Sequence, residues 1–249
     1  MNFNKRIIFL NLIVLVLFSC SNFQKIPKSG YFYPEFQCLK GEGWKNKEKY
    51  NVYIKNWNLF RNLYNKKNGE TGQAKTVIVG NSLVHAFSDS LIEREFPGKG
   101  VVGRGIGGDM SDLLLKRIQE NVLSLNPQTI IIEIGGNDLI QGKCLSYIKS
   151  NVLQLIERIR LNNPDTKIIL TSVPPTRVME LNAISPIYNS FLSRLPEQFY
   201  NLYYVDLWRD MMETDKPIIK KEYSFDNIHF NEKGYKLWGK LLRPYLNKK

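Results

Sequence analysis

Ser82, Asp226 and His229 are residue types that together perform acyl transfer. Ser82 follows an apolar run at residues 76–79 and precedes a helical pattern, so we expect it at a strand-to-helix turn. There its Oγ is exposed and helix amides can stabilise a developing oxyanion. Asp226 and His229 are three residues apart, which allows a carboxylate to contact imidazole Nδ1 while Nε2 faces a serine. By itself, Ser82 is equally compatible with an ordinary helix cap.

The choice of base lies between two residues, because the chain contains two histidines and a serine of ordinary pKa needs an adjacent base. His85 comes three residues after Ser82, within the expected helix, and has no obvious carboxylate partner. We therefore interpret His85 as pocket wall or packing, and His229 as the candidate base.

Two glycine-rich segments offer hydrogen-bond donors. Asn137 follows Gly135 and Gly136, and its side-chain amide can donate to an oxyanion. The glycines around Gly108 let a backbone amide approach the same point. Either segment alone is also explained by tight-turn geometry.

From residue 75 onward, apolar runs alternate with helical patterns, which is typical of a parallel sheet with right-handed crossovers. Runs rich in Ile and Val predict strands at 76–79, 101–102, 129–134, 167–172 and 203–207. Helical periodicity predicts helices at 83–96, 111–125, 145–161, 186–195 and 232–242. Asp109 or Ser111 can cap the second helix and Asn231 the last. These elements predict a three-layer α/β/α domain with a mainly five-stranded parallel sheet.

The candidate residues all follow predicted strands or precede the last helix. In a parallel sheet, the loops at the carboxyl ends of the strands gather at one edge. We therefore expect residues 80–82, 103–109, 135–138 and 226–229 to meet there.

The motifs resemble those of the SGNH, or GDSL-like, hydrolases in order and approximate spacing, over residues 75–246. They are Gly80-Asn81-Ser82, Gly108, the Gly-Gly-Asn-Asp run that ends at Asp138, and Asp226-x-x-His229. The resemblance implies a flavodoxin-like fold, a Ser82-His229-Asp226 triad, and an oxyanion hole from Ser82, Gly108 and Asn137. It implies no cofactor and no metal.

Residues 104–109 and 229–235 resemble the platelet-activating-factor acetylhydrolase-like branch, whose members commonly remove short acyl groups. Two positions differ from the family pattern. Asn81 replaces the usual aspartate beside the nucleophile, which affects a local hydrogen bond and pKa tuning. Gly103 stands where the second-strand motif often has asparagine.

The N-terminus predicts export. Lys5 and Arg6 precede an apolar run at residues 7–18 that is too short to span a bilayer. The sequence before Cys20 resembles a bacterial lipobox, although Phe18 is bulkier than usual, and an ordinary secretory signal is the alternative. We expect residues 1–19 to be a signal peptide, Cys20 to carry lipid, and residues 20–73 to be a tether and amphipathic extension preceding a hydrolase domain at 74–249.

The aromatic stripe of that extension, from Tyr50 to Tyr64, is expected to pack on the domain, with a grip on substrate or membrane as the alternative. For Cys38 and Cys144 we expect two separate buried thiols, although an oxidising compartment permits a bridge. The net charge of +12 becomes +10 when Lys5 and Arg6 leave with residues 1–19 (12 − 2). The basic residues are scattered, so we expect a solvated surface, with attraction to anionic lipid head groups or acidic envelope polymers as the alternative. No nucleic-acid-binding motif is present.

These features predict a serine esterase of the bacterial cell envelope, lipid-anchored on the periplasmic or surface side. It would remove short acyl groups, such as acetyl, from carbohydrate or lipid. The alternatives are a lysophospholipase-like lipid acylhydrolase and a catalytically silent surface-binding lipoprotein. The expected partners are an ester substrate and the membrane, without nucleic acid.

Overall fold

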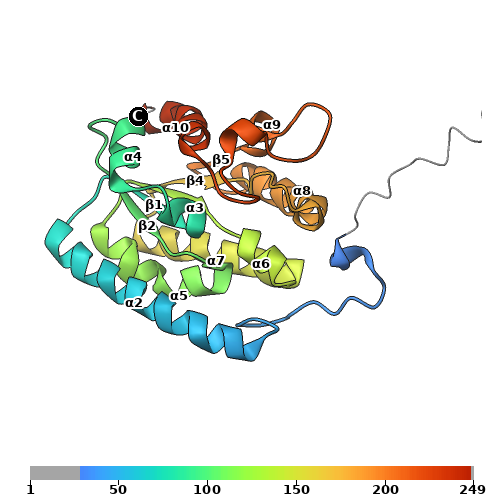
Figure 1. Ribbon diagram of the computed structural model, residues 1–249. Coiled ribbons are helices and arrows are strands. Elements are labelled where there is room, and N and C mark those ends of the chain that lie inside the picture. Colours follow the sequence, from blue (N-terminus) through green and yellow to red (C-terminus); the bar gives the residue numbers. More distant parts are fainter. Residues whose placement is uncertain (1–28, 248–249) are drawn as a thin grey trace, which may run out of the picture.

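The computed structural model describes residues 29–247 and contains one five-stranded parallel sheet (Figure 1). The strand order is β2-β1-β3-β4-β5. The strands are β1 (Thr76–Gly80), β2 (Val101–Gly105), β3 (Thr129–Glu133), β4 (Lys167–Thr171) and β5 (Leu202–Val205). The prediction of five parallel strands is confirmed, with strand ends shifted by up to three residues. The predicted signal peptide and Cys20 lie outside the described residues.

Side chains alternate between the two faces of the sheet, as strand geometry requires. Val77, Val79, Ile130 and Ile132 face one apolar core, whereas Ile78 and Ile131 face the other. The first core also contains side chains from α5 (Ser111–Asn121), α7 (Leu145–Asn162) and α8 (Met179–Arg194). The second is covered by α3 (Ser82–His85), α4 (Asp89–Glu95), α9 (Trp208–Met211) and α10 (Glu232–Asn247). The predicted α/β/α layers are therefore confirmed.

Four predicted helices have clearly different limits. The helix expected at 111–125 ends at Asn121, and a 3-10 turn at Leu123–Leu125 follows it. The helix expected at 83–96 is two helices, α3 and α4, and Ser88 begins the second by accepting from Leu91 N. α8 starts seven residues before Pro186, which lies inside it and supplies no backbone donor. Its side chains Leu181, Ile184 and Tyr188 are buried, which offsets the missing hydrogen bond. α10 likewise continues past Pro244.

The shorter helices connect these elements. They are α6 (Gly136–Ile140) and the 3-10 turns η1 (Gly30–Phe32), η2 (Leu123–Leu125), η3 (Leu195–Glu197) and η4 (Lys221–Tyr223). Within residues 29–247, no helix has the length and hydropathy needed to span a membrane.

The N-terminal extension packs on the outside of α5 (Figure 1). Its helix α2 (Lys47–Thr71) begins at Asn46, whose side chain accepts from Lys49 N at 2.9 Å. Trp57 and Tyr64 of α2 form a third apolar cluster with Met110 and Leu113. The aromatic stripe therefore packs on the domain, as expected.

The prediction of two separate thiols is wrong, because Cys38 and Cys144 form a disulfide with their Cα atoms 4.8 Å apart. The segment before α2 runs beside the turn that precedes α7, where Leu39 N donates to Gly142 O and Cys144 N donates to Leu39 O. These backbone hydrogen bonds bring the two cysteines together, and sequence spacing contains no sign of this pairing.

Candidate active site

Ser82 is the first residue of α3, at the carboxyl end of β1. Asn81 caps this short helix by accepting from Leu83 N at 2.9 Å, so the cap is the residue before Ser82. Position 80 must be glycine because the backbone of Glu133 passes close to it: a Cβ there would lie 2.0 Å from the Glu133 carbonyl oxygen. The turn leaves the side chain of Ser82 at the edge of the sheet and partly exposed.

A hydrogen-bonded chain connects Ser82, His229 and Asp226. The Oγ of Ser82 lies 3.0 Å from His229 Nε2, and His229 Nδ1 lies 2.7 Å from Asp226 Oδ2. If Nδ1 carries the proton, it donates to the carboxylate and leaves Nε2 free to accept from the serine hydroxyl. The spacing of Asp226 and His229 therefore gives the geometry that the sequence predicts.

The loop that carries Asp226 is held by its own backbone. Ile228 N and His229 N both donate to Asp226 Oδ1 at 2.6 Å. Desolvation would raise the pKa of Asp226, but these two bonds and the His229 ring outweigh it, so that the pKa is lowered. Asn231 accepts from Gly234 N at 3.1 Å, which confirms the predicted cap of α10. The carboxylate is therefore kept ionised and aimed at the imidazole.

The Gly107–Gly108 turn and Asn137 lie beside each other. Asn137 Nδ2 donates to the Asp109 carbonyl oxygen at 3.0 Å, which leaves its second amide proton available. A Cβ on Gly107 would lie 4.0 Å from Ser82 Cβ, so this turn adjoins the serine. Gly108 has φ +78°, a conformation that favours glycine. The structure thus gathers the residues predicted to donate to an oxyanion.

The predicted cap of α5 is wrong, because neither Asp109 nor Ser111 caps it with its side chain. The side chain of Asp138, from α6, binds the start of α5 instead. Its carboxylate accepts from Ser111 N at 3.0 Å and from Ser111 Oγ at 2.6 Å. Burial raises the pKa of Asp138 to about 7, although the bonds from Ser111 oppose the shift. This contact fixes the start of α5 to α6.

His85 contacts the glycine turn without a carboxylate partner among the described residues. Its Nδ1 accepts from Gly107 N at 3.2 Å, and its ring meets Phe60 edge-on with centroids 4.6 Å apart. Burial lowers the pKa of His85. The interpretation as packing agrees with these contacts.

Glu133 is a polar residue of this region that the sequence analysis missed. It ends β3 in the same register as Gly80 and is 1% exposed. Burial raises the pKa of Glu133 to about 8, and the side chain of Asn81 partly offsets this rise. No hydrogen bond of ordinary geometry reaches either carboxyl oxygen from the described residues. The sequence did contain one sign of this residue, a single acidic side chain in the Ile-rich run of β3.

A cavity of about 340 Å³ lies between α6, the start of α8 and the N-terminal segment. Tyr31, Phe36, Ile140 and Val178 are among its lining residues. The neighbouring Arg177 donates its backbone N–H to Asn227 O, in the loop of Asp226 and His229, at 2.7 Å. Within residues 29–247, no cluster of three or more His, Cys, Asp or Glu side chains could hold a metal ion.

Residues 72–237 match the family model described as GDSL-like Lipase/Acylhydrolase. The chain belongs to this family. The GDSL-like match covers every residue of the Ser82 site, and it begins just after α2, so it excludes the whole of α2 and the segment before it. The predicted hydrolase class is thereby confirmed.

Solved structures share the GDSL-like fold. A Streptococcus pneumoniae protein named for platelet activating factor has a TM-score of 0.72 and 23% identity, covering 79% of this chain and 95% of its own. A GDSL-like lipase from Bacteroides thetaiotaomicron has a TM-score of 0.62 and 24% identity, with 75% and 98% covered. A catalytic mutant of an acetylxylan esterase from Geobacillus stearothermophilus has a TM-score of 0.56 and 17% identity, with 72% and 96% covered. No curated protein matches the sequence.

Proposed function

We propose that this GDSL-like protein is a serine esterase that hydrolyses short-chain carboxylic esters through an acyl-enzyme. The observation that carries the proposal is the chain from Ser82 Oγ through His229 to Asp226, with contacts of 3.0 and 2.7 Å. Serine and histidine from opposite ends of the domain meet in hydrogen-bonding geometry beside three candidate oxyanion donors. This arrangement supports nucleophilic catalysis.

In the first half-reaction, Ser82 Oγ attacks the ester carbonyl while His229 Nε2 takes the hydroxyl proton. The carbonyl oxygen becomes an oxyanion that Ser82 N, Gly108 N and Asn137 Nδ2 stabilise, each by about 3 kcal/mol. Collapse of the tetrahedral intermediate breaks the bond to the alcohol, which leaves with the proton from His229. The acyl group remains on Ser82.

In the second half-reaction, water attacks the acyl-enzyme and His229 again takes the proton. Collapse releases the carboxylic acid and returns the proton to Ser82. Asp226 stays ionised throughout, because it orients the ring and stabilises the imidazolium. Its lowered pKa suits that role.

For the substrate, we propose acetyl or similarly short esters of envelope or extracellular carbohydrate or lipid. Solved structures with this fold include acetylxylan esterases, which supports a short acyl group on a sugar. A lysophospholipase-like activity on longer chains is the main alternative. A silent binding protein would not need the triad geometry, which favours an enzyme.

We further propose that the protein acts outside the cytoplasm, attached to a bacterial membrane through lipid on Cys20. The Cys38–Cys144 disulfide supports this location, because such bridges persist in oxidising compartments. Labelling with a clickable palmitate should mark the wild type and not Cys20→Ala. Equal labelling of both would contradict the anchor.

The test of the activity compares the full chain, purified in mild detergent, with Ser82→Ala on p-nitrophenyl esters from acetyl to palmitoyl. Rapid release restricted to short chains and lost in Ser82→Ala is expected. Activity that rises with chain length would favour the lipid alternative. A folded wild type as inactive as Ser82→Ala on every ester would favour the silent protein.

A further inference from the structure

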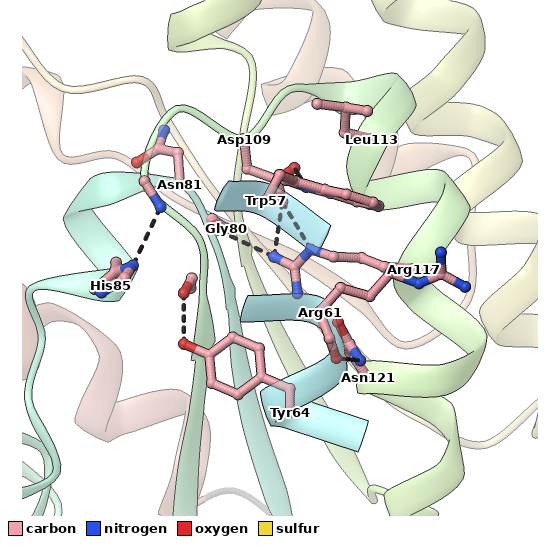
Figure 2. A network of polar contacts seen from close by, with 12 residues as sticks. Trp57, Arg61, Tyr64, Gly80, Asn81, His85, Asp109, Leu113, Arg117 and Asn121 are labelled. Atoms are coloured by element: carbon pink, nitrogen blue, oxygen red, sulfur yellow. Dashed lines mark hydrogen bonds and ion pairs between the residues drawn. The ribbon is translucent and has the colours of Figure 1, made fainter. Parts of the chain in front are cut away.

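The carboxylate of Asp109 is the centre of a buried polar network (Figure 2). Arg117 donates to Asp109 Oδ2 through Nε at 2.9 Å and Nη2 at 2.7 Å. Trp57 Nε1 donates to the other oxygen, Oδ1, at 2.9 Å. Asp109 and Arg117 are fully buried and Trp57 is 3% exposed, so water does not replace a lost partner easily.

This network reaches the three segments that carry the oxyanion donors. Arg117 Nη2 donates to Gly80 O at 3.2 Å, two residues before Ser82. Asp109 directly follows Gly108, and its carbonyl oxygen accepts from Asn137 Nδ2 at 3.0 Å. A shift of Asp109 therefore changes the positions of Gly108 and Asn137 together.

Two residues of α2 support this point from outside the family match, which begins at residue 72. Trp57 supplies the indole donor to Asp109. The ring of Tyr53 lies against Gly108, where an added Cβ would be 2.7 Å from Tyr53 Cε2. Trp44 stacks on Tyr53 with centroids 4.7 Å apart and holds that ring in place.

We propose that α2 is part of the acyl-transfer site, with Trp57 and Tyr53 as positioning residues for the oxyanion donors. The inference rests on the proposed esterase function and extends it to a helix that the family match does not include. Trp57 fixes the Asp109 carboxylate, and Tyr53 supports the turn at Gly108. Neither side chain touches the reacting atoms.

A positioning role for α2 predicts a specific change in the kinetics. The oxyanion exists only in the transition state and the tetrahedral intermediate, so misplaced donors lower kcat and leave substrate binding nearly unchanged. If α2 only added stability, its substitution would lower the free energy of unfolding without changing kcat. Comparing the loss of kcat with the loss of free energy of unfolding in each variant therefore separates positioning from packing.

The key variant is Trp57→Phe, which removes the indole donor and keeps an aromatic ring. Its matched control is Tyr64→Phe on the same helix, because Tyr64 donates its hydroxyl to Gly105 O at 2.5 Å and does not contact Asp109 (Figure 2). Each variant of the full chain is assayed for kcat and KM on p-nitrophenyl acetate and for its urea midpoint.

We expect Trp57→Phe to lower kcat about tenfold, less than the loss of a whole oxyanion donor, with KM within about twofold. Tyr64→Phe should keep kcat within about twofold even where its urea midpoint falls as much. Equal losses of kcat in both variants, or an unchanged kcat in Trp57→Phe, would overturn the inference.

A second variant, Tyr53→Leu, keeps every hydrogen bond to Asp109 and removes the ring beside Gly108. It tests the positioning role of α2 if Trp57→Phe does not fold. It too should lower kcat with little change in KM, and wild-type kcat would overturn the role of α2. Failure of the esterase proposal is recognised separately, because the wild type would then hydrolyse no ester.

Discussion

Ser82 Oγ and His229 Nε2 lie 3.0 Å apart although 147 positions separate the two residues. Ser82 begins the first helix after β1, whereas His229 precedes the last helix, α10. Tyr235 of α10 strengthens this closure, since its hydroxyl donates to Leu83 O, one residue after Ser82, at 2.8 Å. The site therefore exists only when both ends of the domain are folded together.

We predict that His229→Ala lowers kcat on p-nitrophenyl acetate by at least about 10⁴-fold, because the serine loses its base. His85→Gln is the matched control and should stay within about tenfold, since His85 contacts only the glycine turn and Phe60 among the interactions described above. Steady-state kinetics on folded variants measures both. A greater loss in His85→Gln than in His229→Ala would show that the base was wrongly assigned.

Glu133 should make the protein less stable at alkaline pH. In the unfolded chain a glutamate loses its proton near pH 4, whereas the folded protein holds it until about pH 8. The unfolded state therefore binds fewer protons across this window, and the free energy of unfolding falls as pH rises from about 4 to 8.

The variant Glu133→Gln has a side chain of nearly the same shape that cannot lose a proton. It should be more stable than the wild type at pH 9, by an amount on the order of a few kcal/mol, and nearly equal at pH 4. Urea unfolding at both values measures this. Glu157→Gln, on the exposed side of α7, is the control. The same stability difference at both pH values would contradict the prediction.

Asn81 is suited to Glu133 because an amide beside a buried acid adds no repulsion. Asn81→Asp, which introduces the residue usual in the family, should lower the free energy of unfolding at pH 9, where Glu133 is ionised, by about 1 kcal/mol or more. The loss should shrink when Glu133→Gln is present, since like-charge repulsion is then absent. Urea unfolding of the four proteins forms a double-mutant cycle, and strictly additive effects would argue against the pairing.

The Cys38–Cys144 bridge should contribute about 2–4 kcal/mol, since it closes a long loop in the unfolded chain. The double variant Cys38→Ser/Cys144→Ser is expected to unfold at lower urea than the oxidised wild type. Adding a reductant should lower the midpoint of the wild type to that of the variant and leave the variant unchanged. A wild type that does not respond to reductant would contradict this.

Local patterns predicted the sheet and the meeting of Ser82, His229 and Asp226, because each strand and each candidate segment is recognisable from its own residues. The three central strands, β1, β3 and β4, are buried apolar runs. The parallel order brings the residues at the carboxyl ends of the strands together whatever the helix limits are. Helix limits were less accurate, since burial of Leu181 and Ile184 outweighs the cost of Pro186 inside α8.

Two missed features, the Trp57–Asp109 contact and the disulfide, depend on contacts between distant segments. The indole of Trp57 reaches Asp109 across 52 positions, and Cys38 meets Cys144 across 106. Nothing in the residue types near either position identifies the partner. Asp109 suits a helix cap locally, but the buried guanidinium of Arg117 is the stronger partner for its carboxylate.

The disulfide also changes what a protease can do to this protein. A single cut anywhere from residue 39 to 143 opens the backbone but leaves both pieces covalently joined through Cys38 and Cys144. The exposed turn at Gly72, between α2 and β1, lies inside that ring. A molecule nicked there keeps Trp57 attached to the domain that contains Asp109, and its two fragments separate on a gel only after reduction.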